Sequence, residues 1–214
     1  MTQANVLEFE LQRLLLESMT HDLGNLATTI SFLATRKSAG ATVDVPGPVL
    51  AQVASDVTNL LRSQRAIVYG NLLGWSALPA SRTASEWCGT FTRCLTSLTN
   101  PGSNLDFRPG SVDIPSAREA TMMMVTGACI CHIERTHAGH SPHEMSVSLD
   151  QATDDPSSCV LRFGARPADH SLLRQPQTTS EWLDLAMTLC DRQGVSPVIS
   201  RHELEFSFCA SFLT

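Results

Sequence analysis

The sequence predicts an α+β protein in which a long N-terminal helical hairpin precedes a small α/β sandwich. Three observations lead to this prediction. Apolar residues recur every three or four positions through the first third of the chain, and stretches rich in β-branched residues with a period of two appear only after residue 100. The composition, 43% hydrophobic and 17% charged, is that of a chain that folds around a core. We expect two domains, residues 1–76 and 80–214.

The first expected helix runs from about residue 3 to residue 37. Its apolar positions follow helical spacing: Leu7, Leu11, Leu15, Met19, Leu23, Leu26, Ile30 and Leu33. The segment SAGATVDVPGPV (38–49) predicts a loop, and a second periodic stretch follows over about 48–73. Two long helices joined by a short loop form an antiparallel hairpin. A hairpin alone cannot bury so wide an apolar stripe, so we expect a homodimer in which two copies form a four-helix bundle.

After residue 80, helical and strand patterns are expected to alternate. Helical periodicity and short alternating segments mark the elements of an α/β sandwich that ends in a hairpin. Helices are expected over 85–98, 116–135 and 179–193, and strands over 104–109, 144–152, 158–166, 196–201 and 202–213.

Charge and composition exclude several classes of partner. The formal net charge of -6 argues against a nucleic-acid footprint, which shows as clustered Lys and Arg. No apolar run approaches the roughly 20 residues that a membrane span needs, and the N-terminus lacks the pattern of a signal peptide. The seven cysteines are odd in number and several lie in apolar runs, so we expect buried free thiols. These features predict a cytoplasmic protein without a nucleic-acid or membrane partner.

The first candidate functional group is His21, which helical geometry places opposite the apolar stripe. At about 100° per residue, the apolar side chains between residues 15 and 33 cluster around a direction about 160° from His21. The residues on the histidine's own side are small or polar, with one apolar residue on either flank. We expect this docking face to receive a partner protein, and it comprises Leu14, Glu17, Ser18, Gly24, Thr28 and Phe32.

The neighbours of His21 suit a nucleophilic imidazole. A neutral ring presents one unprotonated nitrogen, and Asp22 can hold the N–H of the other and so fix the tautomer. Asn25, one turn later, can donate to an incoming oxygen or position a water. Gly24 costs a helix interior about 1 kcal/mol relative to alanine, which fits close approach by another molecule. We therefore expect His21, Asp22 and Asn25 to be catalytic.

The hexapeptide HDLGNL (21–26) resembles the H-box of bacterial sensor histidine kinases. There, a His followed by Glu or Asp, with Asn or Thr four residues after the His, lies on the first helix of a dimerising hairpin. The segment VTNLLRSQRAIVYG (57–70) looks like the second hairpin helix, and the later order of elements is similar to the ATP-binding domain of these kinases. Kinases often have proline at the position of Leu26, so no kink is expected here.

The departures from the kinase pattern concern nucleotide binding. The helix over 116–135 contains no Asn where an active kinase carries one to help hold Mg²⁺-ATP. The segment 159–185 has one glycine and no Asp-x-Gly-x-Gly box, whose flexible backbone lets phosphates approach. These departures argue against ATP binding, so the resemblance implies a degenerate ATPase-like domain without ATP-dependent kinase activity.

Over nearly its full length the chain resembles the ChpT-type dimeric histidine phosphotransferases of bacterial phosphorelays. The resemblance implies that His21 receives a phosphoryl group from an aspartate of one response-regulator receiver domain and passes it to another. Asp22 and Asn25 fill the matching H-box positions. The implied partners are receiver domains and an upstream hybrid histidine kinase. We expect no cofactor of the chain's own, because Mg²⁺ is supplied by the receiver.

Three alternatives remain open at this point. The chain can be a pseudokinase scaffold or receiver-binding module without chemistry, or an ATP-dependent histidine kinase, or it can use Asn25 to position water for dephosphorylating a receiver. A separate question is the segment CICHIERTHAGHSPHE (129–144), which collects Cys129, Cys131, His132, His137, His140 and His143. Its spacing does not reproduce the paired ligands of structural zinc sites, so we expect no metal there.

Overall fold

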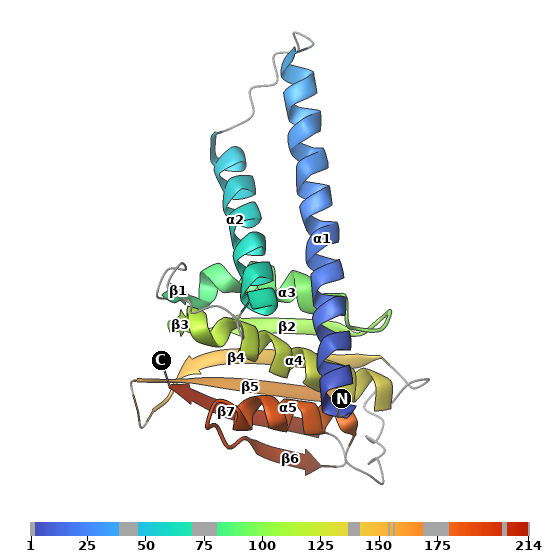
Figure 1. Cartoon of the computed structure of the whole chain (residues 1–214), viewed down its shortest axis with the longest axis vertical. Helices are drawn as coiled ribbons and strands as arrows, with labels where there is room; N and C mark the ends of the chain where they lie inside the picture. Colours follow the sequence, from blue (N-terminus) through green and yellow to red (C-terminus); the bar gives the residue numbers. More distant parts are fainter. Residues whose placement is uncertain are drawn as a thin grey trace.

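Two helices of unequal length stand side by side above a sheet and the helices that cover it (Figure 1). The longer is α1, Gln3–Ser38, and the shorter is α2, Gly47–Tyr69. The expected continuation of the second helix to residue 73 lies outside the described residues. The computed structural model describes residues 3–38, 47–69, 81–136, 142–153, 155, 157–168, 180–202 and 205–213.

The sheet beneath the hairpin has the strand order β2-β4-β5-β7-β6. One pair, β2 with β4, is parallel and the other neighbours are antiparallel. Along β4 and β7 every second residue is buried, which is the pattern of a sheet covered on one face only. The strands are β2 Asn104–Pro109, β4 His143–Gln151, β5 Ser158–Pro167, β6 Val198–His202 and β7 Glu205–Leu213.

Three helices lie on one face of this sheet (Figure 1): α3 Ala84–Thr96, α4 Ser116–Thr136 and α5 Glu181–Asp191. The start of α3 is a capping box. The Glu86 backbone N–H donates to the Thr83 hydroxyl oxygen, and the Thr83 backbone N–H donates to the Glu86 carboxylate. The start of α5 is capped by Ser180, whose side chain accepts from the Leu183 backbone.

The predicted α+β class is confirmed: a helical N-terminal region precedes a mixed five-stranded sheet with helices on one face. The sequence did not predict a second, two-stranded sheet made by β1, Ser81–Thr83, and β3, Asp113–Pro115. Strands of three residues are too short to show alternation. The division into residues 1–76 and 80–214 stays a prediction, and residues 70–80 lie outside the described part of the chain.

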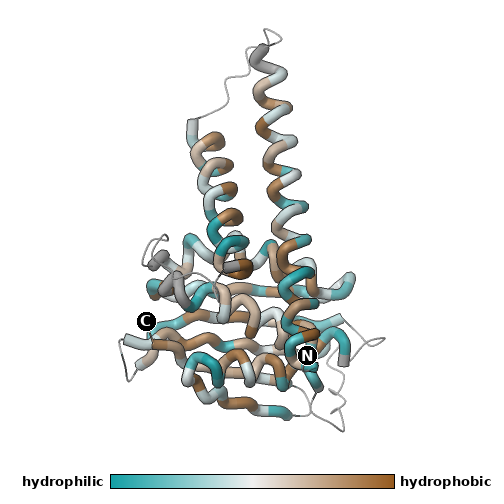
Figure 2. The backbone as a smooth tube through the Cα atoms, viewed as in Figure 1, coloured by the Kyte–Doolittle hydropathy of each residue, from teal (hydrophilic) through white to brown (hydrophobic). Residues whose placement is uncertain are grey.

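The lower half of the hairpin shares one hydrophobic core with the helices beneath it. Met19 and Leu60 are fully buried in the same cluster as Trp87 of α3. Leu11 lies against Gly127 of α4, where a Cβ atom would stand 3.1 Å from the Leu11 Cδ1, so glycine permits this close packing. Beyond Met19 and Leu60, no described hairpin residue towards the free end is buried, although apolar residues continue along both helices (Figure 2).

Ion pairs also hold the hairpin on the α/β part. The most buried joins α2 to α4: Arg62 Nη2 lies 2.7 Å from Glu119 Oε1, and the two side chains are 11% and 2% exposed. Three further pairs are more exposed and join Glu8 to Arg192 at 2.8 Å, Glu10 to Arg135 at 2.9 Å, and Asp56 to Arg93 at 3.1 Å. The hairpin base is therefore attached to α3, α4 and α5 by both apolar and charged contacts.

All seven cysteines are free, and five are buried, which confirms the expectation of buried free thiols for those five. Burial raises the pKa of Cys159 and Cys190 to about 12, so these thiols stay protonated at neutral pH and are poor nucleophiles. Met122, Met123 and Met124 are also buried and fill the core. None of the described helices is both long enough and apolar enough to cross a membrane.

Candidate functional site

His21 lies two residues beyond Met19, after which no described side chain of α1 is fully buried. Its side chain is 76% exposed, and the ring therefore stands in solvent, on the side that helical geometry indicates. The shared core fixes the helix directly below the ring, so the imidazole is accessible while the backbone that carries it is held in place.

One edge of the ring faces two neighbours. His21 Nδ1 lies 3.6 Å from Asp22 Oδ1 and 3.3 Å from the side-chain nitrogen Nδ2 of Asn25. Nε2 has no hydrogen-bond partner among the residues that the structure describes. The two predicted neighbours therefore meet the histidine at one ring nitrogen, and the other is open to an incoming group.

The position of the ring proton decides which nitrogen can attack. A proton on Nδ1 leaves the lone pair on Nε2, and the adjacent Asp22 carboxylate favours that arrangement. The separation of 3.6 Å exceeds hydrogen-bond length, so Asp22 acts on the ring through its charge. Turning the Asn25 amide by half a turn places its oxygen at Nδ1, where it accepts the same proton.

Asp22 is itself held close to the helix. Its side chain is 19% exposed, and its Oδ2 makes no hydrogen bond within the described part of the chain. A carboxylate in such a place keeps acceptor capacity for a proton or for a cationic ring. The geometry thus brings together all three residues that the sequence indicates.

Four of the six docking-face residues are exposed around His21. Glu17 forms an ion pair with Arg13 at 2.5 Å, and the Thr28 hydroxyl donates to the Gly24 carbonyl at 2.9 Å. Phe32 is 55% exposed at the upper end of this face.

Leu14 differs from the expectation: it is half-buried rather than exposed, and Ser18 is half-buried as well. The physical reason is that the lower half of α1 contacts α3, α4 and α5, so packing covers more than one side of the helix. The most exposed large apolar side chain on α1 is Phe9, at 66%, which helical periodicity did not single out. Its exposure depends on where the other helices lie, and no local sequence signal reports that.

Gly24 has no packing role in the described structure. A Cβ atom at this position would meet nothing within 4 Å. Its backbone is helical, so glycine is not required for a left-handed conformation either. The helix therefore carries the cost of a glycine beside His21 without any gain from contacts within the described chain.

The helices α4 and α5 pack against one another, and the segment 169–179 lies outside the described residues. His132 of α4 contacts the Ser180 hydroxyl at 2.6 Å, where α5 begins. Among the described residues, no three His, Cys, Asp or Glu side chains are grouped to hold a metal ion. Two members of the segment 129–144, His137 and His140, lie outside the described residues.

Comparison with known proteins gives a structural likeness without a sequence match. No protein-family model and no curated protein matches the chain. The histidine kinase domain of the blue-light activated histidine kinase from Erythrobacter litoralis EL346 aligns at a TM-score of 0.50 and 9% identity, covering 96% of this chain and 93% of that domain. A longer structure of that kinase aligns at 0.51 and 8% identity, covering 100% of this chain and 60% of its own length.

A bacterial phosphotransferase structure aligns at a TM-score of 0.46 and 14% identity, covering 94% of this chain and 96% of that one. At such low identities, the two alignments to the kinase show only that the helices and strands are arranged in the same way. The hairpin and the sheet with its covering helices therefore have the fold of a histidine kinase domain.

Proposed function

We propose that this chain is a histidine phosphotransferase, which carries a phosphoryl group between receiver-domain aspartates through a phosphohistidine at His21. The observation that carries the proposal is the exposed ring, with Nδ1 facing Asp22 and Asn25 and with Nε2 open to solvent. The kinase-domain fold supports the proposal, because His21 lies on the first helix of the hairpin in this fold.

The chemical step needs little from the chain beyond positioning. Nε2 attacks the phosphorus of an aspartyl phosphate, the P–O bond to the aspartate breaks, and a P–N bond forms. The aspartate leaves as a carboxylate, and the ring keeps its Nδ1 proton and becomes cationic. Asp22 stabilises that charge, and Mg²⁺ held by the receiver would supply neutralisation of the phosphoryl oxygens. The same path in reverse loads a second receiver.

Incubation with a ³²P-phosphorylated receiver domain tests this proposal. Label that appears on the chain and is stable to base but labile to acid supports it, because phosphohistidine has that stability. A chain that binds the receiver but never acquires label is a scaffold instead. Mg²⁺-ATP should give no heat of binding in calorimetry, and measurable affinity would favour an ATP-dependent kinase. The expected donor, an upstream hybrid histidine kinase, belongs to the same proposal.

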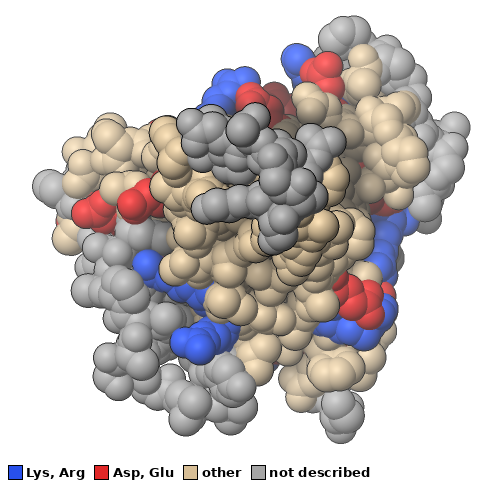
Figure 3. Space-filling model, turned by 90° about the horizontal axis from the view of Figure 1, so that it is seen from above, with Lys and Arg blue, Asp and Glu red and all other residues tan. Residues whose placement is uncertain are grey.

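The proposal includes a homodimer, because the free half of the hairpin leaves apolar side chains uncovered. Leu23, Leu26 and Leu33, which we expected in the bundle core, are only half-buried, and Ile30 is 44% exposed. Seen from above, the described residues at the middle of this end are mostly uncharged, and charges lie toward the rim (Figure 3). A second hairpin packed on this stripe would complete a four-helix bundle.

Ile30→Glu is expected to shift the protein to a monomer. A carboxylate placed on the seam between two hairpins would lose its hydration on association, which costs several kcal/mol. Light scattering coupled to size exclusion measures the mass. Ser31→Glu, on the neighbouring exposed position, is the matched control and should leave the dimer intact. Equal masses for the two variants would contradict a bundle seam at Ile30.

Gly24→Ala is expected to stabilise the helix by about 0.5–1 kcal/mol, because alanine has the higher helix propensity and its Cβ meets no neighbour. We also expect slower phosphoryl transfer, because the added methyl group lies where a receiver approaches His21. Urea unfolding and single-turnover transfer measure the two effects. Unchanged transfer in the stabilised variant would show that close approach does not need glycine.

Phe32→Asp is expected to weaken receiver binding at least tenfold and to change stability by less than about 0.5 kcal/mol, since the ring is more than half exposed. Leu14→Asp, by contrast, should also lower stability, because that side chain is half-buried. Isothermal titration with a receiver and urea unfolding separate the two responses. Full affinity in Phe32→Asp would place the docking face elsewhere.

A further inference from the structure

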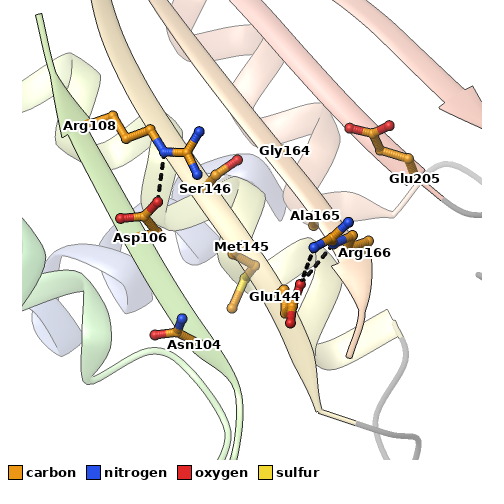
Figure 4. A pocket seen from close by; sticks show the side chains of 10 residues that line it. All are labelled: Asn104, Asp106, Arg108, Glu144, Met145, Ser146, Gly164, Ala165, Arg166 and Glu205. Atoms are coloured by element: carbon orange, nitrogen blue, oxygen red, sulfur yellow. Dashed lines mark hydrogen bonds and ion pairs between the residues drawn. The ribbon is translucent and has the colours of Figure 1, made fainter. Parts of the chain in front are cut away.

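The face of the sheet that carries no helices has a hollow with a volume of about 450 Å³ (Figure 4). It lies over β2, β4, β5 and β7, on the side opposite α3, α4 and α5. It is thus separate from the histidine on α1 and from the helix side of the sheet. Its size is within the range of small-molecule sites, which is about 300–1,000 Å³.

The floor of the hollow is made by small residues in register on the central strands. Ser146 of β4 pairs with Gly164 of β5, and both line the hollow. Gly164 has no positive φ, and the pairing runs through it without interruption, so neither a turn nor a bulge requires glycine. Glycine in the interior of a central strand weakens the sheet and is typical of close approach by a ligand or backbone.

The walls contain two arginines, and they differ in how far they are engaged. Arg166 contacts the Glu144 carboxylate through both Nε, at 2.8 Å, and Nη2, at 2.6 Å, whereas Arg108 contacts Asp106 through Nε alone, at 2.7 Å. In Figure 4 the Arg108 side chain extends from β2 toward β4, which carries Ser146. The terminal nitrogens of Arg108 have no further partner among the described residues, so they can still donate hydrogen bonds.

Glu205 supplies the opposite charge at the other end. It has no ion pair or hydrogen bond to the described part of the chain. Its carboxylate leans over the floor, with Oε1 3.9 Å from the position that a Cβ on Gly164 would take. An added Cβ would also stand 3.1 Å from Ser146 Oγ, so a side chain larger than glycine would project into the hollow.

Besides the Arg108–Asp106 and Arg166–Glu144 ion pairs, the hollow presents the terminal nitrogens of Arg108 on one side and the Glu205 carboxylate on the other, with Ser146 and Gly164 between them. A Cβ on Gly164 would stand 3.1 Å from Ser146 Oγ and 3.9 Å from Glu205 Oε1, so these two oxygens lie within about 7 Å of one another. The Arg108 side chain extends toward Ser146 from the other side (Figure 4), so the charges of Arg108 and Glu205 face one another across about two strands, roughly 10 Å. That separation matches an extended basic amino acid, whose carboxylate and side-chain cation stand at opposite ends. We propose that this hollow binds a basic amino acid, with its carboxylate on Arg108 and its side-chain cation on Glu205.

The probes are L-arginine and agmatine, which is the same molecule without the carboxylate. Backbone amide shifts of Gly164 and Ser146 are followed by NMR on the ¹⁵N-labelled full chain. L-Arginine should give saturable shifts, and agmatine should bind at least tenfold more weakly. No saturable shift with L-arginine at 20-fold excess over about 1 mM protein would overturn the proposal, and equal binding of the two probes would overturn the role of Arg108.

Glu205→Gln and Arg108→Gln should each weaken L-arginine binding at least tenfold. The matched control is Arg162→Gln, because Arg162 pairs with Asp150 at 2.7 Å on the same strands but does not line the hollow. All three positions are exposed, so none is expected to affect folding. Equal losses in all three variants would show general charge attraction in place of a site.

Discussion

Replacing His21 by alanine is expected to abolish phosphoryl labelling by a phosphorylated receiver, with a loss of more than a hundredfold. The variant removes the nitrogen that would form the P–N bond, and neither Asp22 nor Asn25 can replace it as a stable carrier. Because the ring is mostly in solvent, its removal should change the free energy of unfolding by less than about 0.5 kcal/mol. The assay is transfer from the ³²P-labelled receiver, followed by acid and base treatment.

His202→Ala is the matched control for this experiment. His202 is an exposed histidine on the edge strand β6, where its ring contacts Ser200 at 3.0 Å. Labelling should persist in this variant. Label that survives in His21→Ala but is lost in His202→Ala would move the carrier to the α/β part. Loss of the dimer in His21→Ala would contradict an outward position of the ring.

Arg62→Met is expected to destabilise the protein by about 3–5 kcal/mol, the usual loss when one partner of a buried ion pair is removed. The Glu119 carboxylate is only 2% exposed, and the substitution takes away the guanidinium that lies 2.7 Å from it. The loss of stability is expected at the contact between α2 and α4, so the lower part of α2 should pack less tightly on α4. Urea unfolding measures the loss, and hydrogen exchange of α2 amides locates it.

Two further variants separate burial from charge. Arg93→Met breaks the more exposed pair with Asp56 and should cost less than about 1 kcal/mol. The double variant Arg62→Met with Glu119→Leu removes both buried charges and should recover most of the lost stability. Equal losses in Arg62→Met and Arg93→Met, or no recovery in the double variant, would show that the buried pair is not what holds α2 on α4.

Local periodicity was sufficient to predict most of the elements. The helical repeat from Leu7 to Leu33 defines α1, and alternation over 144–152 and 158–166 defines β4 and β5 to within one residue at each end. Each of these patterns repeats within the element itself, so no distant contact is needed to detect it. The short strands β1 and β3 contain too few residues for such a repeat, and they were missed.

The same periodicity predicted the side of the helix on which His21 lies. It did not predict which neighbouring side chains are buried by other helices. His21 and Asn25 share a face because they are one turn apart, and that relation is local. Whether Leu14 is exposed depends instead on α3, α4 and α5, which come from residues at least 70 positions later in the chain. The contact of Leu11 with Gly127 and the pair of Arg62 with Glu119 are equally non-local.

By itself, the sequence determined the α+β class, the extent of most helices and strands, and the outward direction of His21, because each follows from residues that are neighbours along the chain. Only the tertiary structure decided which half of the hairpin is buried, that Phe9 rather than Leu14 is exposed, and that Arg108 and Glu205 flank one hollow. These properties depend on the packing of segments that are distant in sequence, and packing is a property of the assembled core.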